Sequence, residues 1–262
     1  MYKRQEYDGL FPSINSSYSI TDDIIVRAAY ARTMGRPNLT EIIPGMTISD
    51  PSSPTRSITV INTGLKPWMS DGFDLSLETY NVKGGVGTIG VFSKRIDDFF
   101  GILQTEATAE TLEQYGVPEE FPGQYTGYVI TTKQNVGSAT IDGFELSYKQ
   151  TMYFIPGWGK NVQAHANYTE LKLKGANTAD FTGHTPKTLN YGVSFTRPKY
   201  SLRFNVNYRG RIRSALQTPS ATIPANTYNW IAPRTLVGAD IEYRFSKRFA
   251  FYATAINLLD AE

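Results

Sequence analysis

Two histidines, His165 and His184, are the first side chains of this sequence whose type suggests chemistry. Imidazole nitrogen is a common metal ligand, but a metal site needs several donors close together. Cysteine is absent, and neither histidine has a cluster of carboxylates beside it in the sequence. We therefore expect two ordinary polar positions, with no metal and no cofactor.

Motifs for covalent or phosphate chemistry are also weak. The glycine run at 84–87 lacks the Lys-Ser/Thr that follows the glycines of a phosphate loop, and no serine sits in a G-x-S-x-G turn. The adjacent carboxylates Asp97-Asp98 and Glu119-Glu120 fall in expected loops, where a solvated turn explains them better than a hydrolase pair. No catalytic residue emerges, and we expect a protein that is not an enzyme.

Aromatic side chains gather in the expected long connections between strands. Flat rings exposed on loops can stack on a sugar or on an aromatic chelate. The same rings also serve loop packing or anchoring at a lipid interface, and the sequence leaves both roles open. The candidate ligand-binding residues are Trp68, Tyr115, Phe121, Tyr125, Tyr228 and Trp230.

The elements that must position these residues are β-strands. In residues 73–80, FDLSLETY, apolar or small side chains alternate with charged or hydroxylated ones. A period of two places the two sets on opposite faces of a strand. About ten segments are consistent with strands by this criterion and by their spacing. They are residues 10–20, 24–33, 70–81, 86–96, 128–150, 162–172, 187–197, 200–210, 234–245 and 249–258.

The connections between the predicted strands alternate between short and long. The short ones are 21–23, 82–85, 156–160, 197–199 and 246–248, and the long ones are 34–69, 97–127, 173–186 and 211–233. In an up-and-down antiparallel sheet, this order puts every short turn at one rim and every long loop at the other. Such asymmetry is typical of outer-membrane β-barrels, whereas a soluble sandwich has no reason to keep it. Within 97–127, Thr108 and Gly116 bracket a predicted short helix.

The two faces of the predicted strands differ in polarity. One face is apolar, with Phe73, Leu75, Val193 and Phe204 among its members. The other carries charges of both signs, which would line the lumen of a barrel or the solvated face of a soluble sandwich. The predicted lumen-facing residues include Arg27, Asp74, Glu78, Glu145, His165, Arg203, Arg209, Asp240, Glu242 and Arg244.

Composition argues against a helical membrane protein and against a nucleic-acid-binding protein. No segment approaches the roughly 18 consecutive apolar residues of a membrane helix. The formal net charge of +2 is too small to suggest nucleic acid as a partner.

Residues 1–7 lack the apolar run of a signal peptide. Because an open-edged sheet cannot span lipid, we interpret the chain as an incomplete barrel.

Five stretches carry a more specific pattern. They are 27–41 (RAAYARTMGRPNLTE), 62–76 (NTGLKPWMSDGFDLS), 90–100 (GVFSKRIDDFF), 135–146 (NVGSATIDGFEL) and 255–260 (AINLLD). Together and in this order they resemble the barrel of TonB-dependent outer-membrane receptors. The second stretch departs from that family by Thr63-Gly64 where a proline is usual and by Trp68 where a glutamate is usual.

This resemblance implies an all-β, antiparallel up-and-down transmembrane β-barrel. Residues 1–262 would supply about ten of roughly 22 strands, about strands 12 to 21, with the plug domain and the first half of the barrel absent. It also implies a location in the bacterial outer membrane, in contact with its lipid. The activity would be energised uptake of a scarce large solute, driven by the TonB complex through the missing plug and N-terminal box.

The ligand implied by the resemblance is a ferric siderophore or a carbohydrate, and we slightly favour carbohydrate. The alternative function, which rests on the residues alone, is a soluble or surface-exposed β-sheet protein that binds glycans. Detergent requirement separates these two interpretations, because only the barrel has a face that needs lipid.

Overall fold

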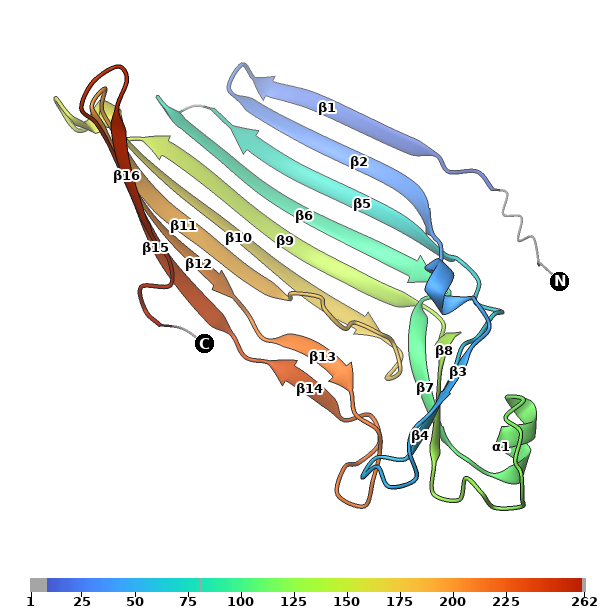
Figure 1. Ribbon diagram of the computed structural model, residues 1–262. Coiled ribbons are helices and arrows are strands. Elements are labelled where there is room, and N and C mark those ends of the chain that lie inside the picture. The colour runs from blue at the N-terminus through green and yellow to red at the C-terminus, as the bar shows by residue number, and fades with distance from the viewer. Residues whose placement is uncertain (1–8, 81, 261–262) are drawn as a thin grey trace.

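The computed structural model describes residues 9–80 and 82–260, and its regular structure is almost entirely β. Residues 1–7, which we expected not to form a signal peptide, lie outside this range. Ten long strands form one antiparallel sheet in the order β1-β2-β5-β6-β9-β10-β11-β12-β15-β16 (Figure 1). Their bounds are β1 (Ser13–Thr21), β2 (Ile24–Gly35), β5 (Trp68–Thr79), β6 (Gly85–Asp97), β9 (Ala139–Thr151), β10 (Val162–Gly175), β11 (Lys187–Thr196), β12 (Tyr200–Arg209), β15 (Arg234–Arg244) and β16 (Ala250–Ala255).

The predicted all-β, up-and-down architecture is confirmed. Every short hairpin lies at one rim of the sheet, and every long connection lies at the other (Figure 1). Gly84 and Gly157 let two of the hairpins turn, at φ +75° and +77°, a backbone conformation that costs a side-chain-bearing residue energy. The sheet is not closed, because β1 and β16 each pair with one neighbour among the described residues.

Cross-strand pairing gathers the predicted apolar side chains on one face of the sheet. Leu75 lies opposite Val91, which lies opposite Phe144 on its other side. Farther along the sheet, Val193 lies opposite Phe204. Leu75 remains 51% exposed and Val91 48% exposed, although a core residue would be almost fully covered. We call this surface the apolar face.

The same register places all ten predicted lumen-facing residues on the opposite face, which we call the polar face. Arg203 lies directly opposite Asp240. Arg27 Nε donates to Glu78 Oε1 at 2.9 Å. The register thus separates the two faces across the sheet, although Phe92, Leu171 and Leu173 also lie on the polar face.

One predicted strand, 128–150, was wrong as a single element. The structure divides it into β8 (Val129–Asn135) and β9 (Ala139–Thr151). Gly137 breaks the run, because its φ of +100° cannot continue a strand. Its carbonyl accepts from the Phe99 NH, and this bond fixes the break at the rim.

The long connections hold regular structure that the sequence did not predict. β3 (Met46–Ile48), β4 (Ser57–Val60), β8 and β7 (Phe100–Glu106) form a second sheet in that order, beyond the long-loop rim (Figure 1). We call it the loop sheet. β13 (Ile212–Leu216) and β14 (Tyr228–Ile231) form a separate two-stranded ribbon, and η1 (Leu39–Glu41) and η2 (Gly159–Asn161) are single turns.

The predicted helix is present as α1 (Ala109–Gln114). Thr108 Oγ1 accepts from the Thr111 NH at 3.2 Å, which satisfies one of the free amides at the helix start. Gly116 follows at φ +64°. Among the described residues no helix is long and apolar enough to cross a membrane.

We predict that Gly143→Ala destabilises the sheet. A Cβ at this position would lie 2.1 Å from the Phe92 ring, which stands opposite on β6. Displacing a packed ring costs about 1–3 kcal/mol. The measurement is the free energy of unfolding, from urea titration of the full receptor reconstituted in lipid vesicles.

Two further variants make this prediction specific. Gly90→Ala is the matched control, because its new Cβ would meet Ser76 Cβ at an ordinary 3.8 Å. Phe92→Leu should recover part of the loss when combined with Gly143→Ala. Equal losses at Gly90 and Gly143 would contradict the packing argument.

Candidate ligand-binding site

Two of the six candidate aromatic residues are part of the core of the loop sheet. Tyr125 is only 9% exposed and meets the Tyr128 ring edge-on at 5.4 Å. Tyr115 packs against the same cluster, which also contains Ile58 and Leu112. These rings therefore serve loop packing, the alternative role that the sequence left open.

Trp68 and Phe121 occupy different environments. Trp68 packs against a second apolar cluster, built around Ile96 and Phe99 at the junction of sheet and loops. Its ring lies over Gly35, where any Cβ would overlap it. Phe121 is 59% exposed on the loop sheet's outer connection. Of these two, only Phe121 offers an open ring.

One lysine ties three long connections together. Lys133 Nζ, on β8, lies 2.6 Å from Glu41 Oε1 and 3.7 Å from Asp180 Oδ2. Glu41 belongs to the connection between β2 and β5, and Asp180 to that between β10 and β11. Burial opposes ionisation of the Glu41 carboxyl. Hydrogen bonds from Lys133 and the Asn38 NH outweigh it and hold the pKa of Glu41 below its usual value.

Two asparagines fasten the loop sheet to the rim. Asn135 Nδ2 donates to the carbonyls of Lys66 and Asp98, and its Oδ1 accepts from the Lys66 NH. Asn62 Nδ2 donates to the Lys133 carbonyl. Each side chain satisfies backbone groups that the turns leave unpaired. Asn62, Lys66 and Asn135 all lie in the sequence stretches that carried the family resemblance.

Tyr228 and Trp230, the remaining candidates, lie together on the β13–β14 ribbon. Arg211 stacks on Trp230 with its Cζ 4.1 Å from the ring centroid, and Arg213 stacks on Tyr228 at 4.3 Å. Beside them, a cavity of about 540 Å³ opens between the ribbon and the outer end of β10. Its lining residues are Leu171, Leu173, Lys174, Gly175, Ala176, Asn177, Phe181, His184, Pro186, Arg211, Arg213 and Trp230. We call it the ribbon cavity.

The two histidines do not meet. His184 lines the ribbon cavity, with its Nδ1 buried and without a hydrogen-bond partner in the described part of the chain. His165 lies on the polar face opposite Lys149. Within residues 9–80 and 82–260 no group of three His, Cys, Asp or Glu side chains could hold a metal ion.

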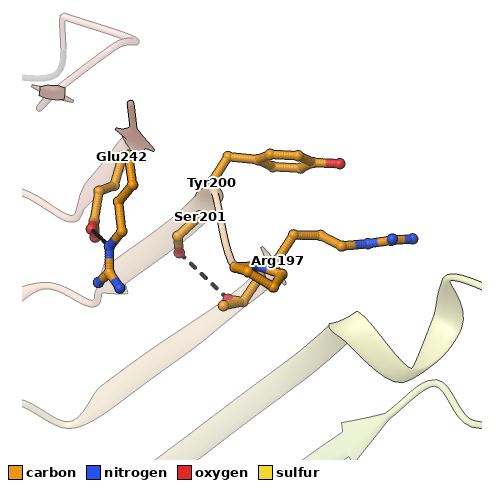
Figure 2. Close-up of a pocket in the computed structure, with 7 residues that line it drawn as sticks. Arg197, Tyr200, Ser201 and Glu242 are labelled. Carbon is orange, nitrogen blue, oxygen red and sulfur yellow. Dashed lines mark hydrogen bonds and ion pairs between the residues drawn. The ribbon is translucent and has the colours of Figure 1, made fainter. Parts of the chain in front are cut away.

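A second hollow, of about 330 Å³, lies at the short-turn rim between β11, β12 and β15. Two pairs of its polar side chains interact with each other (Figure 2). Glu242 Oε1 accepts from Arg244 Nε at 2.6 Å, and Ser201 Oγ lies 3.4 Å from Thr196 Oγ1. Because these four side chains are already paired, and because the ribbon cavity is larger and holds two of the candidate aromatic residues' partners, the ribbon cavity is the better candidate site.

The arginines of this site were missed by the sequence analysis, although a signal was present. Residues 209–234 contain four arginines and no aspartate or glutamate. Arg211 and Arg213 are spaced by two, as are Tyr228 and Trp230, so the pairs fall on one face of a hairpin. Reading the two spacings together would have paired the cations with the rings.

Comparison with known proteins gives one family. The family model described as TonB-dependent receptor-like β-barrel matches residues 2–258. Among curated proteins, the ferric enterobactin receptor of Pseudomonas aeruginosa is 23% identical over 261 residues. The match covers 97% of this chain but 33% of that receptor, so the chain spans about a third of its relative's length.

Solved structures show the same fold. A structure of the Pseudomonas aeruginosa ferric enterobactin receptor with enterobactin has a TM-score of 0.69, 20% identity, and coverage of 95% of this chain and 35% of its own. The siderophore receptor PirA of Acinetobacter baumannii has a TM-score of 0.65 at 17% identity, with coverage of 95% and 37%. The copper transporter OprC has 0.64 at 15%, with coverage of 95% and 33%.

We predict that Glu41→Gln loosens the long connections in a pH-dependent way. Because the folded pKa of Glu41 is lowered, its ion pair contributes fully above the ordinary glutamate pKa of about 4.3. That contribution is lost as pH falls through the lower, folded value. At neutral pH the variant should therefore be cut faster by protease in these loops than the parent protein.

The difference between variant and parent should disappear in acid. Glu110→Gln, which changes an exposed carboxyl on α1, is the matched control. Equal cleavage of Glu41→Gln and Glu110→Gln at neutral pH would contradict a linking role for Lys133.

Proposed function

The chain belongs to the TonB-dependent receptor-like β-barrel family, and we propose that it is part of an outer-membrane receptor for ferric siderophores. The proposal concerns the whole receptor, of which these residues supply one portion of the barrel wall. It assigns transport and no catalysis, in line with the receptors and the transporter that the chain resembles.

The observation that carries the membrane location is the apolar face. Large side chains stay exposed along it from β1 to β16, among them Ile14 at 66%, Leu75 at 51% and Phe251 at 54%. Monomeric soluble proteins rarely expose apolar patches beyond a few hundred Å². A lipid bilayer supplies the missing cover, which disfavours the soluble glycan-binding alternative.

Aromatic rings at the short-turn rim also support a position in the membrane with the apolar face towards lipid. Phe195 contacts Tyr200 at 5.6 Å and Trp158 at 6.4 Å, and Tyr243 contacts Phe245 at 4.8 Å. Rings of this kind concentrate where a barrel meets the membrane–water interface. The polar face then lines the lumen, and the long connections lie outside the cell.

We infer that further strands and a plug domain complete the receptor. A strand edge cannot remain unpaired in lipid, and both β1 and β16 present such an edge. Residues 1–262 would then be a partial barrel domain of about ten strands among roughly 22. The TonB complex would deliver energy through the plug, beyond these residues.

The ligand class follows from the relatives. Two of the similar proteins are siderophore receptors, and one is a copper transporter on the same fold. We therefore place a ferric siderophore ahead of the carbohydrate to which the sequence analysis leaned. The fold by itself does not decide between them, because one barrel architecture serves different solutes.

Uptake of radioactive iron tests this proposal. The full-length receptor is expressed in a bacterial host that lacks its own siderophore receptors, with and without functional TonB. Iron accumulation from a ferric siderophore in the TonB-positive host alone would support the function. Accumulation of a labelled maltodextrin in its place would overturn the ligand class, and accumulation without TonB would overturn the energy source.

We predict that Val193→Arg destabilises the receptor in lipid far more than Asn207→Arg. Val193 lies within the apolar face, 41% exposed, whereas Asn207 lies on the polar face opposite Asn190. An arginine at the lipid midplane costs about 2–4 kcal/mol. The measurement is unfolding by urea in phospholipid vesicles, and similar losses at both positions would contradict the assignment of the faces.

A further inference from the structure

Two short turns carry four exposed cations without a compensating acid. We call these residues the turn cations: Arg197 and Lys199 in the β11–β12 turn, and Lys247 and Arg248 in the β15–β16 turn. Residues 195–201 and 243–250 contain no aspartate or glutamate. Within the described residues none of the turn cations forms an ion pair with a carboxylate. Positive charge is not general along this rim, because the β1–β2 turn carries Asp22 and Asp23.

The backbone holds the two turns side by side. The Arg244 NH donates to the Lys199 carbonyl at 2.7 Å, which joins the end of β15 to the β11–β12 turn. Arg197 and Tyr200 exchange two backbone hydrogen bonds, at 2.8 and 3.2 Å, and these bonds close that turn tightly. The turn cations therefore start from fixed backbone positions and gather in one patch.

A hollow of about 710 Å³ lies between the two turns. Lys199, Lys247 and Arg248 line it together with the rings of Phe245 and Phe249. The two rings are 64% and 71% exposed. The hollow lies on the β12 side of the β15–β16 hairpin, away from the free edge of β16. Three cations beside two open rings suit an amphiphile whose charged end is negative.

Aromatic rings next to the turns set the depth of the turn cations in the membrane. Phe195, Tyr200 and Tyr243 end the apolar face at this rim, and Arg197 Cζ lies 5.8 Å from the Phe195 ring centroid. Figure 2 shows the Arg197 and Tyr200 side chains pointing away from Glu242. Such rings lie at the membrane–water boundary, and a strand advances only about 3.3 Å per residue. The turn cations therefore lie at the level of the lipid phosphates.

The opposite end of the apolar face differs in its charge. Lys174 Nζ lies 3.2 Å from Asp142 Oδ2, and Arg95 Nε lies 3.8 Å from Asp97 Oδ1. Lys172 stands directly opposite Asp142 in register. Acids therefore balance the cations at the long-loop end, and the uncompensated positive charge lies at the short-turn end.

We propose that the turn cations and the hollow between them bind the phosphate headgroup of an anionic phospholipid, in the membrane leaflet that adjoins the short turns. This inference rests on the proposed membrane location and goes beyond solute uptake. Lysine and arginine at a membrane surface attract anionic lipid. The exposed rings add contacts to the upper part of the acyl chains, which free phosphate lacks.

Native mass spectrometry of the full-length receptor in detergent tests the proposal. The probes are phosphatidylglycerol, which has a net negative charge, and phosphatidylcholine with the same acyl chains and no net charge. The parent protein should retain phosphatidylglycerol more tightly. The double variants Arg197→Gln/Lys199→Gln and Lys247→Gln/Arg248→Gln should each weaken that retention by about tenfold, with phosphatidylcholine unaffected. An excess of inorganic phosphate should not displace the lipid.

Arg95→Gln/Lys172→Gln is the matched control, because it removes two cations from the same face at the opposite rim. It should leave the retention of both lipids unchanged. Retention of the heat-resistant barrel form on gel electrophoresis shows that each variant is folded.

The outcomes separate the inference from the function on which it rests. Equal retention of the two lipids, undiminished retention by both double variants, or an equal loss in the control would overturn the headgroup site and leave the receptor function intact. Displacement by inorganic phosphate would overturn lipid as the ligand. A parent protein that stays soluble without detergent would show that the membrane location is wrong, and the site would fall with it.

Discussion

Satisfaction of backbone hydrogen bonds inside lipid is the constraint on which this structure depends. A bilayer offers no partner to an amide or carbonyl, so each strand must find both partners in its neighbours. The ten-stranded ladder supplies these partners from β2 to β15 without interruption. With the backbone satisfied in this way, side chains are free to alternate between lipid-compatible and water-compatible chemistry. That alternation is what the sequence displays most clearly.

Outside the bilayer, a different set of interactions governs the long connections. They are held by side chains that satisfy backbone groups, such as Asn62 and Asn135, and by the shared cation Lys133. The loop sheet also has its own apolar core, in which Ile58 and Ile130 are completely covered. The long connections are therefore folded structures with their own core.

How far the sequence predicts these features depends on the range of the interactions. The period of two in residues 73–80 is local, so the strands, their faces and the short turns could be predicted directly. The loop sheet depends on pairing between segments about 70 residues apart, as with Ser57 and Val129, which no local pattern signals. Tyr125 and Trp230 are both aromatic residues in predicted long connections, but Tyr125 is buried, whereas Trp230 lies beside a cavity. The distinction is made by tertiary packing.

The parallel pairing of β4 with β8 has a consequence for the order of assembly. These strands lie in two separate connections, divided along the chain by the β5–β6 hairpin. Neither connection can complete its sheet until that hairpin has brought their ends together, because closing the intervening chain as a free loop carries a large entropy cost. The strands of the barrel wall therefore pair before the loop sheet forms. A receptor arrested early in assembly would have a folded barrel and unfolded loops.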